Sequence, residues 1–235
     1  MIIGGLQKLT LIDYPGKVAC TVFTVGCNFR CHFCHNPELI DPEKFDAGER
    51  IEENIFFDFL KSRQGLLDGV CVTGGEPTLH PDLPEFLKKI KALGFLVKLD
   101  TNGTNPEMLA ALISEKLVDY VAMDIKTSLQ KDLYEKVTGT TVDIDNIKKS
   151  VAAIMQSGLE YEFRTTVVPG LHSEDDIISL AKEISGAKKY YLQQFRAGEK
   201  ILDQEYKNVK PYPAEFLEDL REKIKDFCGV TEVRD

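Results

Sequence analysis

Residues 18–34 read VACTVFTVGCNFRCHFC, an apolar run followed directly by three closely spaced cysteines. The first part, from Val18 to Val25, is rich in β-branched residues and is typical of a buried strand. Cys27, Cys31 and Cys34 then follow at Cys-x3-Cys-x2-Cys spacing. Thiols on one loop that is anchored by a strand can converge on one metal centre, and thiolates favour zinc or iron–sulfur clusters.

This metal centre could be a structural zinc site or an iron–sulfur cluster. A structural zinc ion needs four ligands, so a zinc knuckle would have to recruit His32 or His35 beside the cysteines. Zinc motifs more often combine a Cys-x2-Cys pair with a second, distant pair of ligands. A cluster of four irons that is held by three thiolates keeps one iron open for a substrate or cosubstrate. The spacing therefore favours an iron–sulfur cluster with an open iron.

Beyond the cysteines, short apolar segments alternate with amphipathic ones. The segments with strand character lie at residues 18–25, 70–72, 95–99, 120–125, 161–168 and 190–195. The segments with a helical spacing of apolar residues lie at 52–62, 83–93, 107–116, 146–157, 174–185 and 214–227. Strands that alternate with helices of this length predict βαβ units and a mainly parallel sheet.

The number of predicted strands limits the fold. A closed barrel needs eight βα units and typically ~250 residues, whereas this chain of 235 residues has six such strands. We therefore predict an α/β fold that forms a partial, TIM-like (β/α)6 barrel, with an open flavodoxin-like sheet as the alternative. One domain should span residues 1–235, with an N-terminal hairpin extension at 1–17 and a C-terminal helix and edge strand at 212–235.

Composition and charge argue against several classes of protein. Hydrophobic residues make up 43% and charged residues 29% of the chain, as in ordinary globular proteins. The net charge of −9 argues against general binding to nucleic acid, whose phosphates attract Lys and Arg. The sequence shows neither a long apolar run nor a signal-peptide pattern. We expect a cytoplasmic protein with no membrane contact, whose six cysteines serve metal or redox chemistry in preference to disulfides.

Unusual residues collect where the predicted strands end, which is where ligands bind in folds of this kind. Gly74, Gly75 and Glu76 follow the second strand. Glycines allow the backbone to approach a ligand closely because no Cβ intervenes, and the Glu76 carboxylate can accept hydrogen bonds from an ammonium group. A simple tight turn would also explain the two glycines.

Charged residues end the next two strands. Asp100 and Thr101 follow one strand, and Asp124 and Lys126 follow the other. Asp124 and Lys126 are two residues apart, so they face the same side of an extended chain. In a purely structural interpretation, Asp100 caps the next helix and Asp124 pairs with Lys126. Several charges that converge at one edge of a sheet each need a partner, which favours a binding site.

The cysteine spacing, with the aromatic Phe33 before the last cysteine, resembles the signature of the radical S-adenosylmethionine (SAM) enzymes. The resemblance implies one 4Fe-4S cluster with three protein ligands, Cys27, Cys31 and Cys34. It also implies that SAM binds the open iron, that Phe33 and His35 lie beside the cofactor, and that reductive cleavage of SAM gives a 5′-deoxyadenosyl radical.

Three further motifs strengthen this resemblance. Gly74-Gly75-Glu76-Pro77 resembles the motif that holds the amino group of SAM, which implies cofactor contacts for Gly74, Gly75 and Glu76. The stretches LDTNG at residues 99–103 and MDIK at residues 123–126 are similar to those of the glycyl-radical-enzyme activating enzymes.

The resemblance to these activating enzymes implies roles for five polar residues. Asp100, Thr101 and Asp124 would hold a monovalent cation, Na⁺ or K⁺, beside the SAM carboxylate. Lys126 would reach that carboxylate or the substrate backbone and so take part in catalysis. Arg196 stands where pyruvate formate-lyase activating enzymes carry a His, which implies contact with adenine or substrate.

The opening LTLIDYPGK at residues 9–17 and the CHNP at residues 34–37 look most like the anaerobic ribonucleoside-triphosphate reductase activating proteins. This resemblance implies a glycyl radical enzyme as protein substrate and a flavodoxin or ferredoxin-type protein as electron donor. Two alternatives stay open: a radical SAM enzyme that acts on a small molecule such as a purine-like precursor, and a structural zinc or electron-transfer iron–sulfur protein. Electron transfer does not need an open iron, which disfavours the latter.

Overall fold

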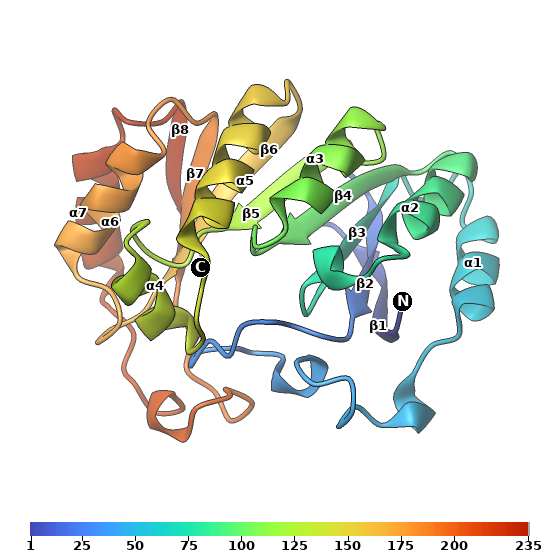
Figure 1. Cartoon of the computed structure of the whole chain (residues 1–235), viewed down its shortest axis with the longest axis horizontal. Coiled ribbons are helices and arrows are strands. Elements are labelled where there is room, and N and C mark those ends of the chain that lie inside the picture. The colour runs from blue at the N-terminus through green and yellow to red at the C-terminus, as the bar shows by residue number, and fades with distance from the viewer. Residues whose placement is uncertain (235) are drawn as a thin grey trace. The chain divides into compact units, whose positions relative to one another are not determined.

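The structure is a computed structural model, and it describes residues 1–234 (Figure 1). The strands are β1 (Ile3–Thr10), β2 (Ala19–Thr24), β3 (Gly69–Gly74), β4 (Leu96–Thr101), β5 (Tyr120–Asp124), β6 (Glu160–Val167), β7 (Lys189–Gln194) and β8 (Val230–Arg234). The α-helices are α1 (Glu53–Lys61), α2 (Leu83–Ala92), α3 (Pro106–Ser114), α4 (Lys131–Thr138), α5 (Ile144–Gln156), α6 (Glu174–Glu183) and α7 (Ala214–Ile224).

The strands form a sheet in the order β1 to β8, which is also their order along the chain. Strand β1 pairs with β2 in antiparallel fashion, whereas β2–β3, β3–β4, β6–β7 and β7–β8 are parallel pairs. Strand β1 therefore forms a hairpin with β2, and β8 is the last strand of the sheet order. The flavodoxin-like alternative is wrong, because the strand order of such a sheet reverses at a switch point.

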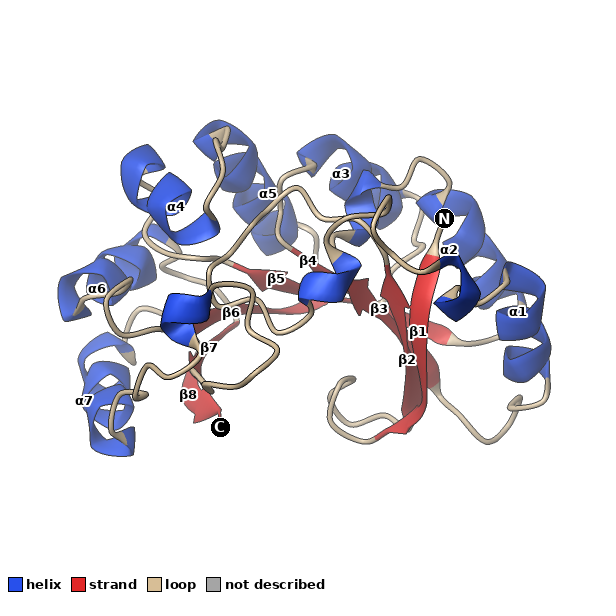
Figure 2. Cartoon of the chain, turned by 90° about the horizontal axis from the view of Figure 1, so that it is seen from below, coloured by secondary structure: helices blue, strands red, loops and turns tan. Residues whose placement is uncertain are grey.

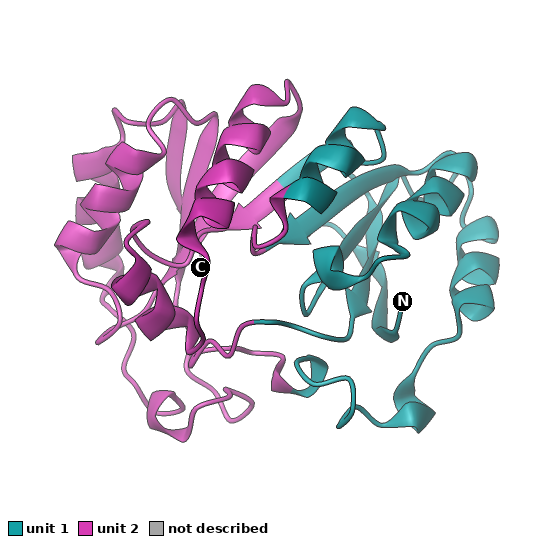
Figure 3. Cartoon of the chain, in the orientation of Figure 1, with its two compact units in different colours: residues 1–28, 38–101, 107–121 teal, residues 29–37, 102–106, 122–235 magenta. Residues whose placement is uncertain are grey.

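The chain divides into two compact units, which Figure 3 shows in different colours. Unit 1 comprises residues 1–28, 38–101 and 107–121, and unit 2 comprises residues 29–37, 102–106 and 122–235. Residue 235 itself lies outside the described part. The interpretation of residues 1–235 as one domain stays a prediction.

In unit 1, the amphipathic helices α1 and α2 lie along one face of the strands (Figure 2). Phe56 of α1 and Phe86 of α2 are buried, and their rings stack with centroids 5.2 Å apart. Leu60 and Ile90, each four residues further along its helix, are also fully buried. This i, i+4 spacing forms the apolar stripe that a helix needs to pack on a sheet.

In unit 2, the ends of the helices follow local sequence signals. Helix α6 begins with a capping box in which Ser173 and Asp176 bond each other's backbone N–H. Helix α5 is followed by Gly158, whose φ of +74° is the left-handed conformation that commonly ends a helix. Sequence patterns missed α4, a short polar helix of which only Tyr134, Val137 and Thr138 are buried. Within residues 1–234, no helix is long and apolar enough to cross a membrane.

Candidate functional site

The cysteine loop is held by backbone hydrogen bonds in each unit. In unit 1, the N–H of Cys27 donates to the carbonyl of Ile40 at 3.0 Å. In unit 2, the N–H of Cys34 donates to the carbonyl of Cys31 at 3.0 Å, and the N–H of Arg30 donates to the carbonyl of Thr138 at 2.8 Å. The unpredicted helix α4, which ends at Thr138, therefore supports the loop that carries two of the three cysteines.

A second segment of unit 2 packs on the same loop. The backbone N–H groups of Leu202 and Asp203 donate to the carbonyls of Cys34 and His32 at 3.1 and 3.0 Å. The His32 Nδ1 lies 2.9 Å from Asp203 Oδ2, and the His32 ring stacks on Tyr206 with centroids 5.6 Å apart. These contacts fix the orientation of the His32 ring on the loop. A hydrogen bond from Nδ1 to a carboxylate is compatible with metal binding through Nε2, so they do not decide between the zinc knuckle and the cluster.

The donor set of the loop suits a soft or borderline metal centre. Cys31 is buried, whereas Cys27 and Cys34 are half-buried, so thiolates held by a fixed backbone are available as ligands. Within residues 1–234, no group of three or more His, Cys, Asp or Glu side chains is gathered as a metal site. Cys27 belongs to unit 1 and the other two thiols to unit 2, so the three-cysteine ligand set stays a prediction.

The two glycines at the end of β3, Gly74 and Gly75, approach the chain's own backbone closely. The N–H of Gly75 donates to the carbonyl of Thr24 at 2.8 Å, and that of Glu76 donates to the carbonyl of Gly26 at 2.7 Å. A Cβ on Gly75 would lie 2.1 Å from the Gly26 oxygen, and Gly74 has a φ of +114°. Only glycine fits at these two positions, which lets the Glu76 loop pack against the residues that lead into Cys27.

Glu76 is fully buried beyond these glycines and is oriented by hydroxyl and amide donors. Its Oε1 accepts hydrogen bonds from the N–H of Thr78 at 3.1 Å, the Thr78 hydroxyl at 2.5 Å and the Thr101 hydroxyl at 2.7 Å. The predicted site residues Glu76 and Thr101 therefore lie in direct contact within unit 1.

Asp100, also in unit 1, is paired with a cation that the sequence reasoning missed. The Lys98 Nζ forms an ion pair with Asp100 Oδ1, and only 1% of the Lys98 side chain is exposed. The signal in the sequence was a lysine inside the apolar strand FLVKLD, two residues before Asp100 and so on the same face of β4.

Asp124, at the end of β5 in unit 2, is paired with two cations. Its Oδ1 lies 2.8 Å from Arg164 Nε, and its Oδ2 lies 3.3 Å from Lys126 Nζ. Burial alone would raise the pKa of Asp124, but Arg164 and Lys126 hold it well below its usual range. Burial likewise opposes the charge on Lys126, whose pKa is nevertheless raised by the negative charges of Asp124 and Cys31.

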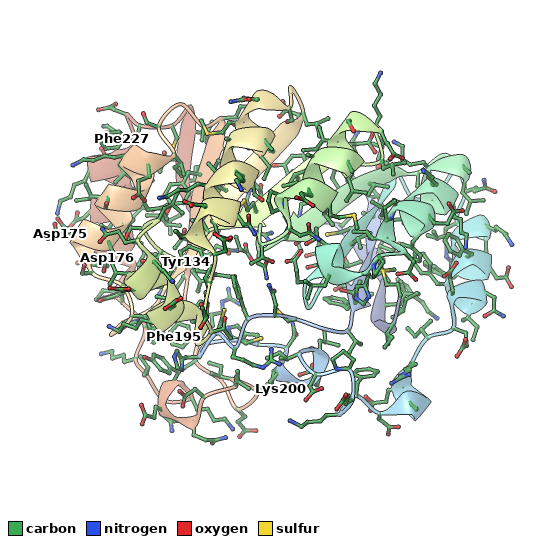
Figure 4. All side chains as sticks on the ribbon, viewed as in Figure 1. Tyr134, Asp175, Asp176, Phe195, Lys200 and Phe227 are labelled. Atoms are coloured by element: carbon green, nitrogen blue, oxygen red, sulfur yellow. The ribbon has the colours of Figure 1, made fainter. Side chains whose placement is uncertain are left out.

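The backbone of Lys126 is fixed by two buried side chains of unit 2. Its N–H donates to the hydroxyl of Tyr134, which lies on α4 (Figure 4), at 3.2 Å. The N–H of Val168 donates to His172 Nδ1 at 2.9 Å, so it is the Nε2–H of His172 that donates to the Lys126 carbonyl at 2.7 Å. Burial lowers the pKa of His172 and keeps it neutral. Sequence reasoning missed His172.

Unit 2 contains a polar pocket of about 390 Å³ at the ends of its strands. The pocket is lined by His35, Asp124, Arg164, Thr166, Gln193, Gln194, Arg196 and Arg234. Three predicted site residues, His35, Asp124 and Arg196, therefore share one pocket. Burial and the charge of Arg196 lower the pKa of His35. The ring of His35 lies 6.5 Å from that of Phe195, which is labelled in Figure 4.

Sequence reasoning also missed the salt bridge beside this pocket. The guanidinium of Arg234 binds both carboxylate oxygens of Glu162, at 2.9 and 3.0 Å, and Arg164 Nη1 lies 3.8 Å from Glu162. The lining residues include three arginines, of which Arg164 pairs with Asp124 and Arg234 with Glu162, so the pocket has a small excess of positive charge and suits a polar or negatively charged ligand group.

Comparison with known proteins places these features in a family. The family model described as the radical SAM superfamily matches residues 21–184. A Methanocaldococcus jannaschii protein, provisionally named a glycyl-radical enzyme activating enzyme, is 37% identical over 91% of this chain and 87% of its own length. The pyruvate formate-lyase-activating enzyme of Clostridium pasteurianum is 29% identical over 96% of this chain and 97% of its own length.

A further relative and a solved structure of similar fold show the breadth of the similarity. A Pyrococcus horikoshii protein, provisionally named a GTP 3′,8-cyclase, is 27% identical over 91% of this chain and 68% of its own length. The crystal structure of Streptococcus suis SuiB bound to S-adenosylmethionine superposes with a TM-score of 0.67 at 17% identity over 90% of this chain. The chain spans about half the length of SuiB, at 49%. These matches confirm the predicted α/β fold of the radical SAM type.

Proposed function

Because this chain belongs to the radical SAM superfamily, we propose that it installs a glycyl radical on a partner protein. The observation that carries the proposal is similarity to activating enzymes along nearly the whole of both chains. It reaches 37% identity for the Methanocaldococcus jannaschii relative and 97% coverage of the Clostridium pasteurianum enzyme. The names of these relatives do not identify the partner of this chain. The hypothesis about the partner comes from sequence motifs.

In this proposal, Cys27, Cys31 and Cys34 hold one 4Fe-4S cluster. Bound together, cluster and SAM supply the one-electron chemistry that yields a 5′-deoxyadenosyl radical. The buried Glu76 would accept a hydrogen bond from the SAM amino group, and the tight packing of Gly74 and Gly75 fixes its position relative to Gly26. The donor chemistry of the loop and this rigid carboxylate support the assignment.

Residues of unit 2 would bind and orient SAM or the substrate. Lys126 presents an ammonium group for the SAM carboxylate or a substrate carbonyl, because Tyr134 and His172 fix its backbone and Asp124 its side chain. His35 and Arg196 line the arginine-rich pocket, which would receive a polar part of SAM or of the substrate. Phe33 packs edge-on against His172, with centroids 6.5 Å apart, and helps to keep water from the loop.

The proposed site contains no monovalent cation. Asp100 and Asp124 are the carboxylates expected to hold Na⁺ or K⁺. Asp100 is already paired with Lys98, and Asp124 is already paired with Arg164 and Lys126. A carboxylate that is neutralised by a neighbouring side chain attracts a metal cation less strongly.

The proposed partner is a glycyl radical enzyme, with anaerobic ribonucleotide reductase as the hypothesis that the motifs at residues 9–17 and 34–37 favour. The relatives named above include an activating enzyme for pyruvate formate-lyase, so a partner other than ribonucleotide reductase fits them equally well. A flavodoxin or ferredoxin-type protein is the proposed electron donor.

The test is an anaerobic reaction of the reconstituted protein with reductant, SAM and candidate glycyl radical enzymes. Electron paramagnetic resonance should show a carbon-centred doublet on the partner. Substitution of the acceptor glycine by alanine in the partner should remove the doublet, as should omission of SAM. Absence of the doublet with every candidate, together with active SAM cleavage, would contradict the proposed substrate.

A second function is favoured by the archaeal cyclase relatives, which are 26–29% identical to this chain. In it, the radical acts on a small molecule such as a purine-like precursor. One assay separates the two functions. If the substrate is a small molecule, 5′-deoxyadenosine should form in proportion to the small molecule consumed, with no radical on any protein.

Under the glycyl radical proposal, short peptides should be poor substrates, since ordering a glycine loop typically costs ~2–5 kcal/mol.

A further inference from the structure

Lys98 is a charged side chain inside unit 1 to which the proposed function gives no role. Its Nζ is paired with Asp100 Oδ1 and lies 3.8 Å from Cys71 Sγ. The centroid of the Tyr120 ring lies 6.0 Å from the same atom, within reach of a cation–π contact. A buried ammonium is costly unless it is paired, so these three groups together form a cage for one positive charge.

The cage is connected to the candidate SAM site through strand β4. Lys98 and Asp100 are two residues apart on this strand, so their side chains leave the same face. Cys71 is the partner of Lys98 in the register of β3 and β4. Thr101, next to Asp100, donates its hydroxyl to the buried Glu76. Asp100 and Thr101 are consecutive residues of β4 whose side chains leave opposite faces. The Lys98–Asp100 pair and the Thr101–Glu76 hydrogen bond are therefore joined through one peptide unit of β4.

We propose that the Lys98 ammonium supplies, from within unit 1, the positive charge that the family resemblance assigns to Na⁺ or K⁺ at Asp100. An ammonium group and a potassium ion carry the same charge and are similar in size, so either can neutralise this carboxylate. Lys98 is a positioning residue, since it acts through Asp100 and is too buried to touch SAM. SAM binding is then independent of monovalent metal ions. The inference rests on radical SAM membership and not on the glycyl radical substrate.

The test measures SAM affinity of the anaerobically reconstituted protein by equilibrium dialysis. Choline is the only monovalent cation in one buffer, and K⁺ replaces it at equal ionic strength in the other. The dissociation constant of the wild type should agree in both within about twofold. Lys98→Met should bind SAM about tenfold more weakly in choline, because it removes a charge-assisted interaction at nearly constant shape. K⁺ or NH₄⁺ should restore its affinity.

Two further variants and one measurement without cofactor separate this role from a structural one. Lys98→Arg keeps the charge and should stay independent of K⁺. Lys91→Met breaks another ion pair of unit 1, in which Lys91 Nζ lies 2.7 Å from both oxygens of Asp119, and should behave as the wild type. K⁺ but not choline should raise the melting temperature of Lys98→Met before cluster and SAM are added.

Three results would overturn the inference. Wild-type affinity that improves about tenfold with K⁺ would show that an external ion is required. Equal weakness of Lys98→Met in choline and in K⁺ would make Lys98 a structural residue, and unchanged affinity would give it no role. If Lys98→Met does not fold, the wild-type comparison alone decides. No partner protein is needed, so failure here leaves the proposed substrate untouched.

Discussion

Glu76 in unit 1 and Asp124 in unit 2 are two carboxylates near strand ends that differ in burial and in the neighbours described above. Glu76 is fully buried and accepts hydrogen bonds from hydroxyl and amide groups of Thr78 and Thr101. Asp124 has one third of its side chain exposed and is paired with Arg164 and Lys126. Hydroxyl and amide donors orient a carboxylate without neutralising it, whereas cationic partners do both.

The difference separates two roles that the sequence motifs do not distinguish. The donors around Glu76 suit a carboxylate that binds the ammonium group of a ligand. The surroundings of Asp124 suit a carboxylate that holds two cations in place, and Lys126 is then the group that meets the ligand. We therefore expect unit 1 to bind the ligand through the Glu76 carboxylate and unit 2 to bind it through the Lys126 ammonium group.

The largest effect is expected from the cysteines, because each supplies one of the three protein ligands of the proposed cluster. Alanine at any of the three should abolish cluster binding. Iron analysis and the visible absorption of the reconstituted protein would measure this, with about four irons per chain in the wild type.

Cys20→Ala provides the matched control, since Cys20 is a fully buried thiol of β2 and burial raises its pKa to about 12. A thiol so reluctant to ionise is a poor metal ligand, so this variant should keep its iron. A Cys27→Ala protein that retains a full cluster would remove Cys27 from the ligand set. Stoichiometric zinc without iron would refute the cluster altogether.

The next effect is on SAM affinity. Glu76→Gln keeps the shape of the side chain and its ability to accept the hydrogen bonds of Thr78 and Thr101, but removes the negative charge. Losing a charge-assisted hydrogen bond to an ammonium group should weaken SAM binding about 10–100-fold. Isothermal titration calorimetry of the reconstituted protein would measure it. Unchanged affinity would place the SAM amino group elsewhere.

A smaller effect, on stability, is expected at Asp124. Asp124→Asn leaves the Arg164 and Lys126 charges without their carboxylate, and should lower the free energy of unfolding by about 1–3 kcal/mol, reduced by solvent screening at this part-exposed site. Because the pKa of Asp124 is lowered in the folded protein, its contribution is present above the ordinary Asp value of about 3.9 and is lost as the pH falls below it.

Urea unfolding of the wild type and Asp124→Asn between pH 7 and pH 3 would measure this contribution. The two curves should differ by a constant amount near neutral pH and begin to approach each other below about pH 4, because the contribution is fully lost only below the lowered folded-state pKa. Glu160→Gln is the control, because Glu160 is an exposed residue of unit 2 that pairs with Lys188 and Lys189 and should matter far less. A constant difference between the curves at all pH values would contradict the ion-pair explanation.

The sequence predicted those parts of the site that depend on local spacing. The Cys-x3-Cys-x2-Cys loop and the Gly74–Glu76 turn are short motifs whose residues act together wherever the chain places them. The helical and strand periods gave the parallel fold, within a few residues at most element ends. Helix α4 was missed because its few apolar residues form no long periodic stripe.

What the sequence did not predict depends on contacts between distant residues. The His172 bond to the Lys126 carbonyl joins positions 46 apart, and the Glu162–Arg234 pair joins positions 72 apart. The buried Lys98 was visible as a charge in an apolar strand, but only β3 and β4 together show that Cys71 lies beside it. Pairing of this kind follows from strand register, which a single sequence leaves undetermined.

The smallest expected effect concerns His172, which holds the backbone of the cation side of the comparison. Its neutral Nε2–H tautomer is fixed by Val168 and the Lys126 carbonyl, and burial lowers its pKa. A lowered histidine pKa means that the unfolded chain binds more protons below about pH 6.5, so this stability contribution is present above that pH and is lost on acidification. The loss should not exceed about 1.4 kcal/mol per pH unit.

Nitrogen-15 NMR of the His172 ring should show the Nε2–H form unchanged at pH 6, and His172→Gln should flatten the acid side of the stability curve. A His172 ring that titrates near pH 6.5 would show that the anchor of Lys126 is not the rigid, neutral group described.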